Sequence, residues 1–477
     1  MPGCLASLTA LPRPSVSRVL RGIVVGLFLA TGAAALAQQE TAPPRITTDG
    51  EKEWGRKNSI ALTKAVKAPQ PSAQEKELLI SAAKFYVDRL TNPDNANSTL
   101  RMMDQYFTVV VYGPSTSAAA RAILLETTVE HCRELLVASP PFTEVVNTNL
   151  VILLSRLYAQ PGNAQKGTPP VPYVATIVPL QAVINSETLT LPPKIRAARA
   201  LGVIGLNSVA GVQGGDLSIK NRDGIVTDLV KALKSKVAQG KSVGACWYRE
   251  SLVDALGNCD LPLTLAGASD PIDALMGRLV DRDEDLQVRG AAARAISQCS
   301  LNNTFNIPLI VHEIAIYHLQ LAQTYNATPP AARRGSFKWA AWFGYLAFKG
   351  ADPAQAARGW GLIAWGTKPA LAANKELITG AQGVCLPIQT ALLNVPALPA
   401  AIPAASLDAL KAWLKKTAPA NRKVTPKSAD IATPDSRTAY DPPGAAAPAA
   451  GAPAKGPMGT QEKTTPMPMT MTSGNGK

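Results

Sequence analysis

The chain has 477 residues and a formal net charge of +14, and aromatic residues make up only 5% of it. Ala and Leu are abundant, which suits long helices and argues against a β-sandwich, whose strands are rich in Val, Thr and Tyr. Lys and Arg are spread along the chain instead of being gathered with aromatic residues, so the charge indicates a solvated surface and not nucleic-acid binding. Contact with an anionic polymer of the cell envelope stays open as an alternative.

The first 37 residues have the pattern of a secretory signal peptide. Three arginines precede an apolar, charge-free stretch from Gly22 to Ala37, which ends in Ala35-Leu36-Ala37. Such an end predicts cleavage after Ala37 and export to the periplasm, the cell envelope or the exterior. The alternative is an uncleaved anchor, but the stretch is short for a membrane-crossing helix, so we expect no membrane span after cleavage.

Three further segments follow the signal peptide. Residues 38–71 are polar and dotted with Pro, which predicts a mostly unstructured linker with one short helix near Trp54. Residues 72–416 keep helical apolar spacing and are predicted to form one helical-repeat domain. Residues 417–477 lose this periodicity and become rich in Pro, Ala and Gly. Because such a segment cannot bury enough apolar surface to offset its ordering entropy, we predict a disordered tail.

The clearest local pattern is a pair of helices between residues 270 and 300. Asp270-Pro271 is a typical helix start, with Asp as the N-cap and Pro in the first turn. The run "DRDED" (281–285) interrupts the apolar spacing, and "DLQVRGAAARAISQCS" (285–300) begins a second helix with Asp285 as its cap. Two such helices joined by a short polar turn form an αα-hairpin.

Copies of the second helix recur along the chain. The run "AARAIS" from Ala292 is similar to "LVDALG" from Leu252, "AARALG" from Ala197 and "AARAIL" from Ala119, with offsets of 40, 55 and 78 residues. The offset of 55 is 40 plus an insertion at 211–224, and a weaker copy from Leu153 fills the gap of 78. Small residues at these positions let the backbones of stacked helices approach closely.

The segment "PIDALMGRLVDRDEDLQVRGAAARAIS" (271–297) resembles a HEAT repeat, with its Pro-started helix, acidic turn and V-R-x-x-A-A-x-A-L-G helix. Val288-Arg289 provides the Val-Arg pair, and Arg249 and Lys194 take the Arg place in the earlier copies. The resemblance is clearest over 190–300, weaker over 75–190, and no copy fits 301–416. It implies an all-α, right-handed α-solenoid of about five to seven stacked antiparallel helix pairs, HEAT/armadillo-like, that binds partners along one face. It implies no chemistry.

The segment "FKWAAWFGYLAF" (337–348) gathers six aromatic residues in a chain that has few. Helical spacing places Trp339 on one face with Trp342 and with Phe343. If these rings are exposed, they can stack on sugar rings; if they are buried, they form the core at one end of the repeat array. Exposed and coplanar rings of Trp339 and Trp342 would therefore favour a carbohydrate-binding surface, and buried rings would exclude it.

The candidate metal and catalytic patterns do not survive inspection. His312-Glu313 with His318 resembles a zinc-binding helix, but a spacing of six places the two histidines about 120° apart around a helix. The acidic run 281–285 lacks the Gly and the final Glu of an EF-hand loop. The sequence therefore predicts no catalytic residue, no metal ligand and no cofactor.

Five cysteines lie beyond the signal peptide, too few for a disulfide scaffold in so long a chain. Cys246 and Cys259 lie on one predicted helix about 20 Å apart and cannot pair. Cys259 and Cys299 are separated by 40 residues, the repeat offset, which predicts equivalent positions on neighbouring helices. They form a disulfide only if both point into the seam between these helices, and the alternative is two buried thiols.

These observations predict an exported helical-repeat scaffold or protein-binding protein, without catalytic activity and with an unknown protein partner. A carbohydrate- or cell-wall-binding module that uses the aromatic cluster 337–348 is the alternative. A third possibility is an enzyme whose site carries no familiar motif. A pocket with convergent His or carboxylate side chains would favour the enzyme, and a smooth face along the repeats would favour the scaffold.

Overall fold

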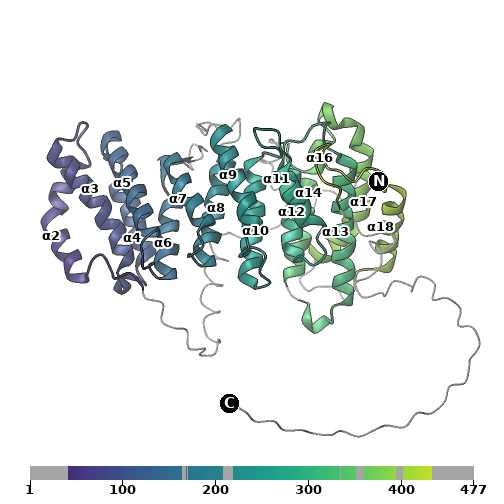
Figure 1. Ribbon diagram of the computed structural model, residues 1–477, viewed down its shortest axis with the longest axis horizontal. Coiled ribbons are helices and arrows are strands. Elements are labelled where there is room, and N and C mark those ends of the chain that lie inside the picture. The colour runs from purple at the N-terminus through teal and green to yellow at the C-terminus, as the bar shows by residue number, and fades with distance from the viewer. Residues whose placement is uncertain are drawn as a thin grey trace, which may run out of the picture. The chain divides into compact units, whose positions relative to one another are not determined.

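A computed structural model describes residues 41–163, 168, 170–207, 219–333, 335–350, 359–393 and 401–431. The predicted signal peptide, residues 432–477 of the predicted tail and the first part of the 211–224 insertion lie outside these residues. The protein is all-α, and its helices are labelled in chain order in Figure 1. The described chain falls into two compact units, the first ending at Arg156 but including Glu187–Pro193, and the second made of Leu157–Ser186 and the residues from Lys194 onward.

The first unit is a cluster of helices in which α3 packs against α2 and α5, and α5 packs against α6. Its core holds Tyr106, whose hydroxyl lies 2.6 Å from the Thr128 hydroxyl. The Ser72 and Glu75 side chains cap the start of α3 reciprocally, which satisfies backbone N–H groups that have no helical partner. The elements are α2 (Thr48–Ala65), α3 (Ala73–Asp88), η1 (Arg89–Thr91), η2 (Pro93–Asn95), α4 (Thr99–Gln105), the π-helix η3 (Tyr106–Val111), α5 (Ala118–Leu136) and α6 (Glu144–Ser155).

Helix α2 is longer than the short helix expected near Trp54, and it replaces most of the predicted linker. It is capped by Thr47 and runs for 18 residues. The Trp54 ring stacks on Phe85 of α3 at 3.9 Å, and Glu51 pairs with Arg89 at 2.7 Å. The segment is polar because α2 buries only one side, and average polarity therefore concealed the helix.

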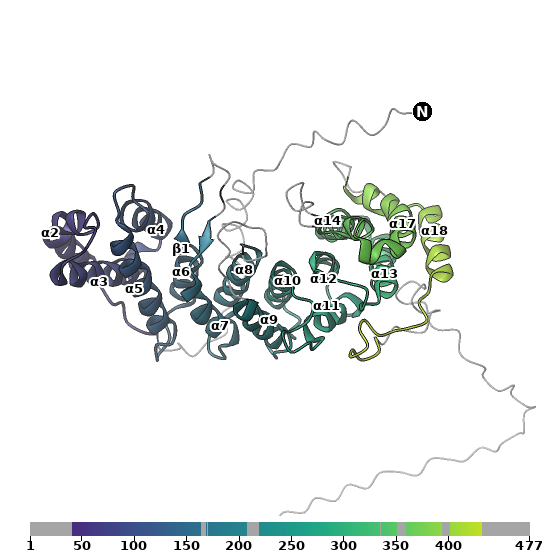
Figure 2. The ribbon, with the colours of Figure 1, turned by 90° about the horizontal axis from the view of Figure 1, so that it is seen from above.

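The second unit arranges its first eight helices in two layers. Figure 2 shows α8, α10, α12 and α14 side by side in one layer, and α7, α9, α11 and α13 in the other. The elements are β1 (Tyr158–Gln160), β2 (Val171–Pro172), η4 (Val174–Thr176), α7 (Ile177–Asn185), α8 (Leu191–Asn207), α9 (Ile219–Leu233), α10 (Val243–Cys259), α11 (Asp270–Val280), α12 (Leu286–Gln298), α13 (Ile307–Ala327), η5 (Pro330–Ala332), α14 (Ser336–Lys349), α16 (Leu362–Trp365), η6 (Pro369–Asn374), α17 (Lys375–Leu393) and α18 (Ala404–Lys416). The two strands pair antiparallel, with Tyr158 opposite Pro172.

The α11–α12 pair lies where the sequence predicted a helical hairpin, with one difference at its start. Asp285 caps α12 by accepting a hydrogen bond from the Gln287 backbone at 2.7 Å, as expected. Asp270 is the first residue of α11 and not its N-cap, which is Ser269. Pro271 occupies the first turn, where its missing N–H costs no helical hydrogen bond.

Three buried cations donate to backbone carbonyls at or after the end of the preceding helix in successive helix pairs of the second unit. Lys194 of α8 donates to the Ser186 carbonyl just after α7, and Arg289 of α12 donates to the Leu279 carbonyl in the last turn of α11 at 2.9 Å. Arg249 of α10 donates to two carbonyls in the segment after α9, at 2.5 and 2.7 Å. Lys194 and Arg289 thereby reach carbonyls at helix ends, which lack helical partners, and a cation there also complements the helix dipole.

Small residues bring the helices of one layer close together, as the repeated pattern predicted. A Cβ atom added to Gly202 of α8 would lie 2.9 Å from the Ala255 Cα of α10. One added to Gly257 of α10 would lie 2.6 Å from the Ala295 Cα of α12. Both distances are below normal contact, so the two glycines permit the spacing of α8, α10 and α12.

Residues 417–431, predicted to be disordered, run back along the second unit as a strap (the name used below for these residues). The Asn306 backbone N–H donates to the Val424 carbonyl at 2.8 Å, and the Ser428 hydroxyl donates to Asp273 at 2.6 Å. The Val424 side chain is fully buried. The strap is ordered by these distant partners, which composition alone does not reveal.

Candidate binding surfaces

Of the three aromatic residues predicted to stack on a ligand, Trp339 and Trp342 are exposed on α14 and Phe343 is not. The Trp339 side chain is 56% exposed and Trp342 is 38% exposed. The Trp342 ring stacks on Tyr345, with centroids 5.5 Å apart and an angle of 19° between the planes. Phe343 is buried beside α12 at 7% exposure, so it cannot stack on a ligand as proposed from the sequence. Trp360 and Trp365 are also buried and belong to the core.

A third tryptophan, Trp247 of α10, is exposed on the same layer of helices at 46%. Helices α10 and α12 are covered by α9 and α11 on one side, and α14 packs against α12, α13, α16 and α17. We call Trp247, Trp339 and Trp342 the tryptophan face. Sequence analysis missed Trp247, although the spacing of Trp247, Glu250 and Asp254 places them on one stripe of a helix.

Charged residues of both signs accompany Trp247 on α8, α10 and α12. Arg294 pairs with Asp254 at 3.4 Å, and Arg199 donates to the Ser251 hydroxyl at 3.1 Å. Burial and the neighbouring Asp254 carboxylate raise the pKa of Glu250 to about 7. Arg199, Asp254 and Arg294 occupy one position of the repeated pattern, so this row of charges follows the stacking of the helices.

The cysteines that were candidates for a disulfide are free and buried. Cys259 ends α10 and Cys299 directly follows α12, and neighbouring residues of these helix ends meet because Ser300 donates to the Asp260 carboxylate. The predicted equivalence of the two positions therefore agrees with the packing, whereas the disulfide is not formed in the structure. Burial raises the pKa of both thiols, that of Cys259 to about 12, which keeps them protonated and unreactive.

The two histidines of α13 lie in the core. His318 is fully buried, contacts the Ile314 carbonyl at 2.8 Å and the Gln389 amide at 2.8 Å, and burial lowers its pKa to about 4. His312 lies 3.1 Å from the Leu414 carbonyl. Within the described ranges, no three His, Cys, Asp or Glu side chains gather in a geometry suited to a metal ion.

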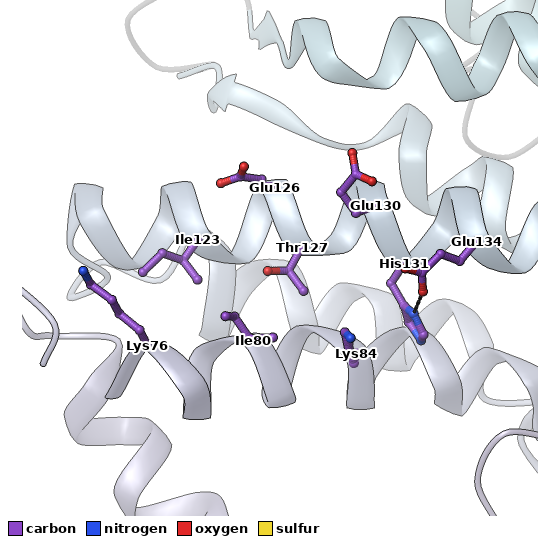
Figure 3. Close-up of a pocket in the computed structure, with 9 residues that line it drawn as sticks. All are labelled: Lys76, Ile80, Lys84, Ile123, Glu126, Thr127, Glu130, His131 and Glu134. Carbon is purple, nitrogen blue, oxygen red and sulfur yellow. Dashed lines mark hydrogen bonds and ion pairs between the residues drawn. The ribbon is translucent and has the colours of Figure 1, made fainter. Parts of the chain in front are cut away.

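A shallow cavity of about 390 Å³ lies between α3 and α5 of the first unit, and sequence analysis did not identify it. Figure 3 shows side chains of both helices along it, with lysines on α3 and carboxylates on α5. We call it the α3–α5 groove. Its lining residues are Lys76, Ile80, Lys84, Ile123, Glu126, Thr127, Glu130, His131 and Glu134.

His131 closes one end of the α3–α5 groove by joining the two helices. Its Nε2 lies 2.7 Å from Asp88 of α3, and its Nδ1 lies 3.0 Å from Glu134. Burial alone would lower the pKa of His131, but the hydrogen bonds to Asp88 and Glu134 outweigh it and raise the pKa. A protonated His131 can donate to both carboxylates at once.

No helix among the described residues combines the length and hydropathy that a membrane crossing requires. Comparison with protein-family models, with curated proteins and with solved structures finds no match to this chain.

Proposed function

We propose that this chain is an exported, non-catalytic helical-repeat protein that holds a protein partner on the tryptophan face of its second unit. The observation that carries the proposal is the exposure of Trp247, Trp339 and Trp342 on one layer of helices. The solvent-exposed part of an indole ring makes no contact within the fold, whereas it gains much at an interface. Trp and Arg are enriched among residues that dominate binding energy, and Arg199 and Arg294 lie on the same layer.

A HEAT-like, right-handed α-solenoid of antiparallel helix pairs is the architecture that we propose for the repeats. The recurring contacts of Lys194, Arg249 and Arg289 support it, because one sequence position performs the same task in three helix pairs. The glycines at 202 and 257 support it in the same way. Such arrays present a continuous face to a partner, which agrees with a scaffold role.

Export is proposed from the signal-peptide pattern that ends at Ala37. The thiols fit an oxidising compartment, since Cys132, Cys259, Cys299 and Cys385 are buried and burial raises the pKa of each. A buried, protonated thiol reacts slowly and needs no disulfide partner.

The test is affinity capture from the cell-envelope fraction with the chain beginning at Gln38. We compare it with the triple variant Trp247→Ala/Trp339→Ala/Trp342→Ala and with the control Ile60→Ala/Leu100→Ala/Val109→Ala, which changes three exposed apolar residues of the other unit. A binding hot spot loses about 2 kcal/mol or more on truncation to Ala, so the tryptophan variant should lose the stoichiometric partner and the control should retain it. Equal recovery by both variants would contradict the proposal.

Carbohydrate binding on α14 is the second candidate. It is favoured by the exposed Trp339 and by the stacked Trp342 and Tyr345, because flat rings can contact the C–H faces of sugars. Lys349 lies 5.6 Å from the Tyr345 centroid and adds positive charge, which suits an anionic envelope polymer. Retention of the protein on insoluble cell-wall polysaccharide, lost in Trp339→Ala/Trp342→Ala but not in Trp247→Ala, would favour this candidate over the protein partner.

A further inference from the structure

The α3–α5 groove has walls of opposite charge. On α5, Glu126, Glu130 and Glu134 recur every four residues and form one acidic row. On α3, Lys76 and Lys84 form a basic row with Ile80 between them. Figure 3 shows the two rows along neighbouring helices of the groove.

Much of this charge is not used within the described part of the chain. Lys76, Lys84 and Glu126 form no ion pair there, and no lysine of α3 comes within 4.0 Å of a carboxylate of α5. Glu130 pairs only with Arg133 of its own helix, on a solvent-exposed surface. Like charges at four-residue spacing destabilise a helix by a few tenths of a kcal/mol per pair, so Glu126, which has no ion pair among the described residues, does not stabilise α5.

The floor of the groove is apolar and partly open to solvent. Ile80 is 39% exposed, and Ile123 and Thr127 lie part-exposed opposite it on α5. An apolar floor between two charged rows matches the cross-section of an amphipathic helix, whose apolar stripe is flanked by polar residues on both sides.

We propose that the α3–α5 groove binds an amphipathic helical segment of a partner protein, with basic residues on the flank toward α5 and acidic residues on the flank toward α3. The lining of α3 from Lys76 to Lys84 corresponds to about 12 Å of helix length, and that of α5 from Ile123 to Glu134 to about 16 Å. A docked helix of about three turns covers this length. The acidic row repeats about every turn of α5 and the basic row about every second turn of α3, so the flanks of a docked helix meet charges on both walls. This site goes beyond the tryptophan face and does not depend on it.

The test uses synthetic helical peptides as probes. Three fluorescein-labelled 18-residue peptides share a Leu stripe and carry Lys on one flank and Glu on the other, Lys on both flanks, or Glu on both flanks. Fluorescence anisotropy is read with the chain beginning at Gln38, at low and high salt. The mixed peptide should bind tightest, and each single-sign peptide should bind about tenfold more weakly because one flank is repelled. A fourth, mixed peptide with Pro at its centre should lose binding, since Pro breaks the helix.

Charge reversal on α3 provides the decisive variant. In Lys76→Glu/Lys84→Glu both walls are acidic, so preference should move from the mixed peptide to the Lys/Lys peptide. The control Lys236→Glu/Lys241→Glu makes the same change of net charge on exposed lysines of the second unit and should leave the preference unchanged. All four lysines are exposed, so both variants are expected to fold.

Three results would overturn the inference. The first is that no peptide binds. The second is that the charge reversal on α3 moves the preference no further than the control does. The third is that the Pro-containing peptide binds as well as its parent, which would replace a helical occupant with an extended one.

Discussion

Arg249 joins three segments of the second unit through buried hydrogen bonds. It donates to carbonyls after α9 and pairs with Glu284, which precedes α12, at 2.7 Å. Its side chain is 8% exposed and that of Glu284 is 2% exposed. Removing one member of a buried pair is costly because the other charge stays in a poorly solvated place. Arg249 therefore holds successive helix pairs together.

Arg249→Ala should lower the free energy of unfolding by about 3–5 kcal/mol. We expect a loss at the lower end of this range, because Arg278 remains paired with Glu284 at 3.1 Å. Lys234→Ala is the control, since its pair with Asp270 is exposed and should contribute about 0–1 kcal/mol. Urea unfolding followed by circular dichroism measures both, and equal losses would show that Arg249 is not a buried anchor.

His131 makes the stability of the first unit depend on pH. Its pKa is raised in the folded state, so the stabilising contribution is fully present below the ordinary histidine pKa. It is lost as the pH rises through the raised folded value. Asp88, Glu134 and Lys84 are the charged groups around it.

The difference in melting temperature between the parent chain and His131→Gln should be larger at pH 5.5 than at pH 8.5. The glutamine amide can donate hydrogen bonds but carries no charge, so the variant lacks the charged state of a protonated histidine. Thermal scans at the two pH values measure the difference. A difference in melting temperature that grows toward high pH would mean that the pKa of His131 is lowered in the folded state instead.

Among the elements, the contact of α10 with α12 depends on a glycine. A Cβ atom at Gly257 would lie 2.6 Å from the Ala295 Cα, and backbone cannot move aside cheaply. Gly277 of α11 has nothing within 4 Å of such an atom and is a matched helical glycine.

Gly257→Ala should therefore destabilise the protein by about 1–3 kcal/mol. Gly277→Ala should stabilise it by up to about 1 kcal/mol, the difference in helix propensity. Chemical denaturation of both variants measures these changes. If Gly257→Ala were also stabilising, the two helices would lie further apart than described.

Sequence patterns predicted those elements that depend on residues close to one another in the chain. Asp285 could be predicted as the cap of α12 because the N–H groups that it caps lie within a few residues of it. The small residues of the repeats indicated that neighbouring helices pack closely. The strap could not be predicted, since its partners Asn306 and Asp273 lie 115 to 155 residues earlier. The α3–α5 groove was not predicted for a similar reason. Its acidic and basic rows can be recognised as the walls of one groove only when α3 and α5 are known to be neighbours.

The strap runs from α18 back to α11 and to the start of α13, and it connects these helices of the second unit. Asn306 donates through its side chain to the Asn421 and Lys423 carbonyls at 2.9 and 3.0 Å, and Lys427 donates to the Gly267 carbonyl at 2.9 Å. These bonds span distant parts of the sequence, so they stabilise the unit as a whole.

A chain that ends at Lys416 should have a free energy of unfolding about 2–5 kcal/mol lower than one that ends at Ile431. The shorter chain lacks one buried valine and several hydrogen bonds of the strap. The longer truncation product keeps the strap and serves as the matched control. Differential scanning calorimetry compares them, and identical melting temperatures would show that the strap contributes nothing.

At the scale of the whole molecule, the proposed function is that of an exported protein that binds a partner on the tryptophan face. Site-specific photo-crosslinking in the envelope tests this most directly, with p-benzoylphenylalanine in place of Trp247, of Trp339 or, as the control, of the exposed Val109 in the first unit. We expect one and the same crosslinked protein from positions 247 and 339 and none from position 109. Crosslinks of equal yield from all three positions, or none from 247 and 339, would contradict it.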